Sequence, residues 1–541
     1  MAAPQVTIKQ GTVVGTLIEA GLPKPVDAFL GVPYALSPTG DRRFRVAEPV
    51  AASTETIDAS KFGPAAPGKQ LLAPAPGKPP MVYSEDCLTA NIFRQAGSST
   101  TKMPVMVYLH GGAFNRGTSS MHNTSSFVSY SAKPFVAVSF NYRIGALGFL
   151  PSALSAKEGA LNLGLKDQKL LFQWVQENIE AFGGDPDCVT LMGLSAGAHS
   201  IGHHIMNYTE GVKPLFQRAV IESGAPTSRA VRPYSAPIHE AQFSDFLKEC
   251  GVPETLPQDE IFSFLRNLPS ATVQAAQTAV FDKYNPSLAW AFQPVIDGEV
   301  IPRPPLETYT KGLYHKVSIM TGFQHNEGSL YVKKAMAEPA EFTAFFRGLL
   351  PLLSDDDIAT VDRLYPDPAT IPDSIYKETR PGMGAQYKRV EAAYGHYAYV
   401  APVRQTAEFM SAGGDKPVYL YHWALIMTVN DGARHADNLK YETRDPAVTK
   451  LSPAQAEVAG TIHAYITSFI TSGDPNAVPG EFGSRPEWKP YTKTGKQALI
   501  VGKDNEELIG GAIGVPASCE EDVWSREQCE FWWSKVELSQ Q

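Results

Sequence analysis

The chain has 541 residues, of which 43% are hydrophobic and 19% charged, so it can bury a large core and is not a disordered chain. Its 47 basic and 56 acidic residues leave a net charge of −9, which excludes a general attraction to nucleic acid or to an anionic membrane surface. No apolar run approaches the ~20 residues that span a bilayer, and Met1–Gln10 lacks the features of a signal peptide. We therefore expect a cytoplasmic protein, with a mature secreted form as the alternative.

Seven short apolar runs bounded by turn residues predict β-strands. They are apolar almost continuously rather than alternately, which is typical of strands covered on both faces. In chain order the predicted strands are Val105–Leu109, Phe135–Phe140, Val189–Met192, Ala219–Ile221, Val317–Met320, Val418–Trp423 and Ala498–Val501. A segment rich in proline and glycine, Gly63–Pro80, predicts a surface loop.

A helix is predicted between two of these strands, over Lys166–Phe182. Its apolar residues recur at helical spacing and its other face is polar, as in a helix packed on a sheet. Because strand, helix and strand follow one another, we expect an α/β fold with a large, mostly parallel central sheet covered by helices on both faces.

The sharpest local motif is Gly193-Leu194-Ser195-Ala196-Gly197, which follows a predicted strand and precedes a run compatible with a helix, Ala198–Ser200. A serine on such a turn has a strained backbone that exposes its hydroxyl, and flanking glycines leave room for the turn. This pattern indicates a nucleophile, although a serine that caps a helix is the structural alternative.

A serine nucleophile needs backbone donors for the oxyanion that forms when it attacks a carbonyl. The segment His110–Phe114 follows the strand Val105–Leu109 and contains Gly111, Gly112 and Ala113. We expect the N–H groups of Gly112 and Ala113, together with that of Ala196, to form the oxyanion hole. On its own the pair of glycines could merely shape a turn.

Six ordered blocks, including the serine motif, together resemble the type-B carboxylesterase/lipase family, the cholinesterase-like branch of the α/β-hydrolases. The other blocks are Phe29–Ala35 with Arg42–Phe44, Ser84–Leu88, Asn141–Gly145, Gly183–Pro186 and Pro294–Gly298. The resemblance implies an α/β-hydrolase fold with one domain over 1–541, and insertions at about 225–315 and 333–410 that form a cap and gorge walls.

The resemblance also implies the rest of a catalytic triad. The family's acid is a glutamate in an E-G-S context after a strand, which corresponds to Glu327 here. Its histidine lies in a loop beyond the next core strand, which corresponds to His435, while the rival His422 falls inside a strand. The implied reaction is ester hydrolysis through an acyl-enzyme on Ser195, with no metal and no organic cofactor.

Departures from the family narrow the expected substrate. Gly77 stands where relatives that bind choline esters carry a tryptophan, and Leu194 stands where they carry a glutamate, so we do not expect a choline ester. The segment before Glu85 shows no amphipathic lid helix, which favours small to medium apolar esters over interfacial lipase action. Cys87 and Cys250 lack the family's partner cysteines, which fits a reducing compartment.

The remaining family positions are assigned to the substrate pocket or to the scaffold. We expect the pocket to include Gly111, Leu194, Leu288, Trp290 and Phe292, although the last three could equally be core residues. Two buried ion pairs are expected to tie loops to the sheet, namely Arg43–Glu85 and Arg143–Asp167.

Two other functions stay open at this point. One is a lipase or sterol esterase of the same family, and the other is a non-catalytic adhesion module, a class whose members have usually lost part of the triad. Retention of Ser195, Glu327 and His435 argues against adhesion. The expected partner is a small-molecule ester, without nucleic acid or a membrane span, and the oligomeric state stays open.

Overall fold

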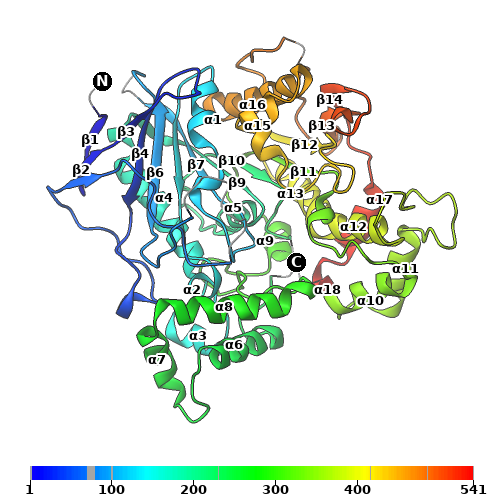
Figure 1. Cartoon of the computed structure of the whole chain (residues 1–541), viewed down its shortest axis with the longest axis horizontal. Helices are drawn as coiled ribbons and strands as arrows, with labels where there is room; N and C mark the ends of the chain where they lie inside the picture. The colour runs from blue at the N-terminus through cyan, green and yellow to red at the C-terminus, as the bar shows by residue number, and fades with distance from the viewer. Residues whose placement is uncertain are drawn as a thin grey trace.

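The described residues form an 11-stranded mixed sheet that runs through the molecule (Figure 1). The computed structural model describes residues 3–69, 80–98, 102–228, 231–414, 416–483 and 485–539. In spatial order the strands are β14 (Val515–Glu521), β13 (Gln497–Lys503), β12 (Val418–Trp423), β11 (Ser318–Gln324), β10 (Arg218–Glu222), β9 (Gly184–Leu194), β7 (Met103–Leu109), β8 (Val136–Phe140), β6 (Thr89–Gln95), β4 (Val26–Pro33) and β3 (Thr16–Ile18). All seven predicted strands are present in it.

The central strands of the sheet are parallel. Every neighbouring pair from β8 through β7, β9, β10, β11 and β12 to β13 is parallel, and the strands at both edges pair antiparallel. A second, small sheet contains β1 (Gln5–Ile8), β2 (Gly11–Val14) and β5 (Thr56–Asp58). The parallel centre matters for function because the carboxyl ends of all its strands meet at one edge.

Both faces of the large sheet are buried. Along β7, Val105, Val107 and Leu109 belong to one apolar cluster, whereas Met106 and Tyr108 belong to another. The first cluster includes residues of α4 (Leu163–Asn178), α5 (Ala196–Met206) and α13 (Ala401–Ala412); the second includes residues of α1 (Thr124–Tyr130) and α16 (Pro453–Ser472). This two-sided cover explains the continuous apolar runs in the sequence and confirms the predicted α/β fold class.

The long helix after β8 differs from its prediction at both ends. It begins at Leu163, three residues before Lys166, and its last predicted turn, Ile179–Phe182, is a 3₁₀ turn rather than α-helix. At the junction the Asn178 side-chain amide donates to the carbonyl of Trp174 at 2.9 Å. Asparagine is a poor interior helix residue because its amide competes for backbone groups in this way.

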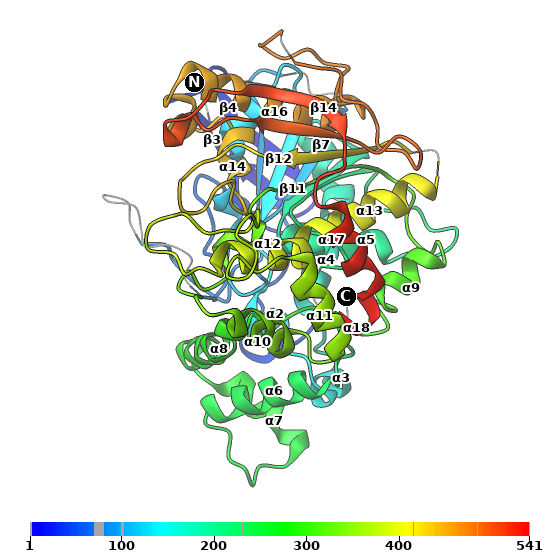
Figure 2. The same cartoon turned by 90° about the vertical axis from the view of Figure 1, so that its right-hand side faces the viewer.

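A layer of helices lies beyond the sheet, at the bottom of Figure 1 and again in the turned view of Figure 2. It contains α6 (Pro237–Glu249), α7 (Ile261–Asn267) and α8 (Ser270–Tyr284), while α10 (Pro339–Leu349), α11 (Asp355–Leu364) and α12 (Tyr387–Gly395) lie to the right in Figure 1. These helices fall within the predicted insertions at about 225–315 and 333–410. The division of the chain into one domain with two insertions stays a prediction.

The remaining helices are short. They are α2 (Gly145–Gly148), α3 (Ala153–Glu158), α9 (Pro305–Thr310), α14 (Asn438–Glu442), α15 (Pro446–Thr449), α17 (Arg526–Ser534) and α18 (Val536–Ser539). Across the described ranges, no helix combines the length and the apolar character that crossing a bilayer requires. Of the predicted loop Gly63–Pro80, residues 70–79 lie outside the described residues.

The two predicted ion pairs are present and buried. Arg43 Nη2 lies 2.7 Å from a carboxylate oxygen of Glu85, and Arg143 Nη2 lies 2.7 Å from one of Asp167. Arg143 also donates through Nη1 to the carbonyl of Arg45 at 2.7 Å. The second pair thus joins the segment after β8, the helix α4 and the amino-terminal region.

Arg143→Met is expected to lower the free energy of unfolding by about 3–5 kcal/mol, because it leaves the fully buried Asp167 carboxylate without its charged partner. Urea unfolding followed by circular dichroism would measure the loss. Adding Asp167→Leu should recover most of it, since the unpaired charge is then gone. The matched control is Arg42→Met in the exposed Arg42–Glu48 pair, which should cost less than about 1 kcal/mol. Equal losses at the two sites would contradict the prediction.

Candidate active site

Ser195 lies on a sharp turn between β9 and α5. Its backbone has φ 59° and ψ −123°, a strained conformation for a residue with a side chain, and its N–H donates to the carbonyl of Glu222 at 2.9 Å. A Cβ on Gly197 would lie 2.0 Å from the carbonyl oxygen of Leu109, and one on Gly193 would lie 2.8 Å from the same atom. The glycines of the motif are therefore needed because the turn packs directly on the end of β7. The helix begins at Ala196, two residues earlier than the run used to predict it.

Glu327 and His435 form a buried hydrogen-bonded pair. His435 Nδ1 lies 2.5 Å from Glu327 Oε2, and Glu327 Oε1 accepts the N–H of Gln324 at 2.8 Å. A carboxylate at Nδ1 fixes the tautomer that carries its proton there, which leaves Nε2 of the imidazole as a proton acceptor. The contact joins residues that are 108 positions apart in the sequence.

The three predicted triad residues follow the ends of strands in the same parallel part of the sheet. Ser195 follows β9, Glu327 follows β11 and His435 lies in the loop after β12, and these strands lie in the order β9, β10, β11, β12. All three residues therefore sit at one edge. The ring of Tyr399 packs against both the His435 loop and α5: its centroid lies 4.7 Å from that of His435 and 6.2 Å from that of His199 on α5.

The predicted oxyanion loop lies against the serine. A Cβ added to Gly111 would come within 3.0 Å of Ser195 Cβ. Gly112 and Ala113 both have positive φ, at 116° and 55°, and the carbonyl of Ala113 accepts the side-chain amides of Asn115 at 2.9 Å and Gln293 at 3.0 Å. These contacts hold the peptide planes of the loop in one orientation, which is what preorganised donors require.

The predicted pocket residues lie in different surroundings. Leu288 and Trp290 line a cavity of about 50 Å³, and Trp290 also packs with Ala113 in a small apolar cluster. Phe292 packs edge-on against Phe246 at 5.9 Å in the main core. Leu194 is buried at the end of β9. Of the three candidates before Pro294, Leu288 and Trp290 thus lie on this cavity, whereas the core environment of Phe292 matches the alternative reading.

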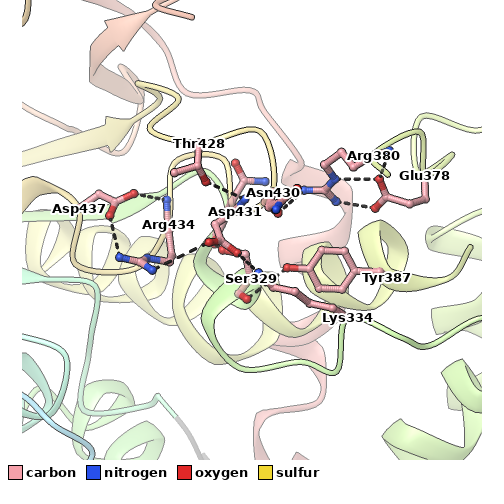
Figure 3. A network of polar contacts seen from close by, with 11 residues as sticks. Ser329, Lys334, Glu378, Arg380, Tyr387, Thr428, Asn430, Asp431, Arg434 and Asp437 are labelled. Atoms are coloured by element: carbon pink, nitrogen blue, oxygen red, sulfur yellow. Dashed lines mark hydrogen bonds and ion pairs between the residues drawn. The ribbon is translucent and has the colours of Figure 1, made fainter. Parts of the chain in front are cut away.

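The loop that carries His435 is tied to neighbouring segments by a polar network (Figure 3). Lys334 Nζ pairs with Asp431 at 2.5 Å, and Arg380, which is paired with Glu378, donates to the carbonyl of Asn430 at 2.9 Å. Both Lys334 and Arg380 belong to the second predicted insertion, at about 333–410. They restrain the loop on its exposed side.

His422 has the environment of a core residue. It lies in β12, as predicted, and its Nε2 is 3.1 Å from Nδ1 of His325. Burial lowers the pKa of His422 well below its usual value, so that its imidazole is neutral in the folded protein. The ring stacks on Trp524 with centroids 4.7 Å apart.

Two buried carboxyl groups beside the site were not predicted from the sequence. Glu222 ends β10 and Glu442 ends α14, and the side-chain amide nitrogen of Asn438 donates to both, at 3.0 and 3.1 Å. The available signal was weak: Glu222 directly follows a predicted buried strand, a position where functional side chains gather. Nothing in the spacing pairs it with a residue 220 positions later.

The cysteines agree with the expected lack of family disulfides. All five are free thiols, and Cys87 and Cys250 are buried. Burial raises the pKa of Cys250 to about 12, which makes it an inert thiol at neutral pH. Gly77, which carried the prediction against choline esters, lies outside the described residues.

Comparison with known proteins places this chain among ester hydrolases. The profile of the Carboxylesterase family matches residues 2–532. "Secreted lipase 4" of Gibberella zeae is 33% identical over 97% of this chain and 91% of its own, and "Lipase 2" of Geotrichum candidum is 29% identical over 92% of both chains. The crystal structure of Aspergillus niger EstA superposes with a TM-score of 0.84 at 27% identity, covering 100% of this chain and 99% of the other.

Proposed function

The chain belongs to the Carboxylesterase family and is a carboxylic ester hydrolase, and from this premise we propose that it works through a triad of Ser195, His435 and Glu327. The observation that carries the proposal is the 2.5 Å contact between His435 and Glu327, at the sheet edge that also presents the strained turn of Ser195. Retention of all three residues also separates this chain from non-catalytic members with an incomplete triad.

In the proposed mechanism, Ser195 Oγ attacks the ester carbonyl while Nε2 of His435 takes its proton. Glu327 holds the imidazole through Nδ1 and offsets the positive charge that develops on it. The N–H groups of Gly112, Ala113 and Ala196 donate to the oxyanion. His435 then protonates the leaving alcohol, and water, activated by the same imidazole, releases the acid from Ser195.

We propose that the substrates are small to medium apolar esters. Support comes from the apolar Leu194 beside the proposed nucleophile. It also comes from Trp290, which packs in one apolar cluster with Ala113 of the proposed oxyanion loop and would limit the room for a long acyl chain there. A lipase is the second candidate, favoured by the names of the relatives from Gibberella zeae and Geotrichum candidum.

Hydrolysis of p-nitrophenyl esters with two to sixteen acyl carbons tests the substrate range, alongside emulsified long-chain triacylglycerol. We expect kcat/KM to be highest for short and medium chains and to fall for long ones. Trp290→Ala should shift the optimum toward longer chains, because it removes the indole that packs beside Ala113 of the proposed oxyanion loop. A rate that rises only above the solubility limit of the ester would instead identify a lipase.

We propose a cytoplasmic location, supported by the five unpaired thiols. The relative from Gibberella zeae is named a secreted lipase, so secretion is the alternative. Assay of esterase activity in cells and in medium, in the native host with and without deletion of the gene, distinguishes the two. Activity that disappears from the medium alone would contradict the proposal.

A further inference from the structure

Two buried carboxyl groups at the candidate active site take no part in the proposed mechanism. Glu222 and Glu442 are both fully buried, and one amide nitrogen, Nδ2 of Asn438, donates to each of them. Glu222 Oε1 also accepts the hydroxyl of Tyr421 at 2.9 Å. Within the described part of the chain, the other oxygens, Glu222 Oε2 and Glu442 Oε1, have no hydrogen-bond partner. Two of the four carboxyl oxygens are therefore buried without a donor, and one proton placed between the two groups would remove that deficit.

Among the described residues, no cationic group contributes to the pKa shifts of this pair. His122 Nε2 lies 3.5 Å from Glu442 Oε1, but burial lowers the pKa of His122 to about 3. His463 on α16 donates to the main-chain carbonyl of Glu442, and burial lowers its pKa to about 4. The other titratable groups that interact with the pair are the Tyr108 and Tyr421 phenols and, through Tyr421, Glu327.

Burial acts in the same direction on both acids, and it raises the pKa of Glu442 to about 7. The contact between the two carboxyl groups has opposite effects on them: together with burial it raises the pKa of Glu222 well above its usual value, and it lowers the pKa of Glu442, as expected when Glu222 holds the proton. Two carboxyl groups in such surroundings cannot both be ionised near neutral pH. The pair therefore holds one proton between its two members. A proton on Glu222 Oε2 would make that oxygen a hydrogen-bond donor, and the Glu442 carboxylate would accept the bond.

The pair is connected to all three segments of the proposed triad. The main-chain carbonyl of Glu222 accepts the N–H of Ser195 at 2.9 Å. Asn438 follows His435 by three residues and begins α14. Asn438 Oδ1 also accepts the side-chain amide of Gln324 at 2.9 Å, and the N–H of Gln324 donates to Glu327 at 2.8 Å. Through its own main chain and through Asn438, the pair is thus connected to the segments that position Ser195, Glu327 and His435.

We propose that Glu222 and Glu442 share one proton and that this singly ionised pair is a positioning device, which holds Asn438, and with it the His435 loop, against the strand that supports Ser195. When the shared proton is lost to solvent, two carboxylates face each other without a counter-charge, and the bridge through Asn438 opens. The inference deepens the proposed function and rests on its triad.

The test is the pH dependence of kcat for p-nitrophenyl butyrate between about pH 6 and pH 9.5. In the wild type we expect kcat to fall about tenfold on the alkaline side, with the change reversible. In Glu222→Gln and in Glu442→Gln, an amide replaces the protonated carboxyl and donates to the remaining carboxylate. Each variant should keep kcat within about threefold of wild type at neutral pH and lose the alkaline fall. Glu442→Ala should lower kcat across the whole range, since it leaves Asn438 without that partner.

Glu391→Gln is the matched control. Burial raises the pKa of Glu391 to about 8, and this carboxyl accepts the Asn326 side chain at 3.3 Å beside Glu327, so it is the rival source of an alkaline fall. Persistence of the fall in both Gln variants of the pair, or its loss in Glu391→Gln, would overturn the inference. So would a wild-type rate of labelling by a fluorophosphonate that stays constant to about pH 9.5 while circular dichroism is unchanged. If Ser195→Ala stays active, the proposed triad itself fails. If Ser195→Ala is inert but the alkaline fall persists in Glu222→Gln and Glu442→Gln, only the inference about the pair is refuted.

Discussion

Ser195→Ala is expected to lower kcat for p-nitrophenyl butyrate by about 10⁴-fold or more, with the fold intact. In the proposed mechanism the hydroxyl oxygen of Ser195 forms the acyl-enzyme, and the alanine side chain has no group that can replace it. The residual rate would come from the oxyanion donors and from substrate binding alone. Steady-state assay, with active-site titration by a fluorophosphonate to exclude wild-type contamination, measures the change.

The control for this variant is Ser468→Ala, which removes another buried serine hydroxyl on the opposite face of the sheet. Its activity should stay near that of wild type. Combining Ser195→Ala with His435→Ala should cost little more than Ser195→Ala alone, because an imidazole without a nucleophile has no proton to take. A Ser195→Ala enzyme that keeps a tenth of the wild-type kcat would contradict the assignment of the nucleophile.

Ser195, the proposed nucleophile, is the residue of the candidate site whose local structure the sequence predicts best. A strand, a tight turn with glycines on both sides and a helix follow one another along the chain, and the structure places Ser195 on that turn. The packing of Gly197 on Leu109 then explains the motif, since any side chain there would collide with the end of β7.

The acid and the base were predicted in another way. Glu327 and His435 came from the family resemblance, and no spacing rule would join two residues that are 108 positions apart. Their contact depends on how the loops after β11 and β12 fold over the sheet edge. That arrangement depends in turn on partners such as Lys334 for Asp431, which a pattern of residue types does not predict.

The carboxyl pair lies further beyond the reach of sequence analysis. Whether Glu222 is a solvated carboxylate or a buried acid depends on Tyr421 and Asn438, which lie far from it in the sequence.

The carboxyl end of α4 was mispredicted for a more local reason. The Asn178 side chain bonds to the last turn of the helix, and the apolar spacing continues into the 3₁₀ turn that follows. Periodicity reports which face is buried and does not report the type of helix.

Stability is expected to be highest near pH 7 and to fall steeply toward pH 5, because many histidines are buried in the neutral form. Burial lowers their pKa values to about 3 or 4, or in one case well below the usual value. These residues are His110, His122, His203, His204, His239, His325, His396, His422 and His463. In the unfolded chain each of these histidines has a pKa of ~6.5. On acidification the unfolded state therefore binds protons that the folded state does not bind, which lowers the free energy of unfolding. Each histidine costs about 2 kcal/mol of stability between pH 7 and pH 5.

Buried carboxyls oppose this trend with the opposite sign. Burial raises the pKa of Glu391 to about 8, of Glu442 to about 7 and of Asp437 to about 6, and that of Glu222 also rises. A raised carboxyl contributes stability below its folded pKa and loses it as pH rises through that value, so these four groups gain at most about 2.7 kcal/mol each on acidification from pH 7 to pH 5. Nine histidines against four acids leave a net loss on the order of 10 kcal/mol, or about 10 °C in Tm for a chain of this length. Differential scanning fluorimetry at pH 5, 6, 7 and 8 measures it. His203→Phe, which removes one such imidazole, should narrow the difference between pH 7 and pH 5, and a Tm that is equal or higher at pH 5 would show that these histidines are protonated in the folded protein.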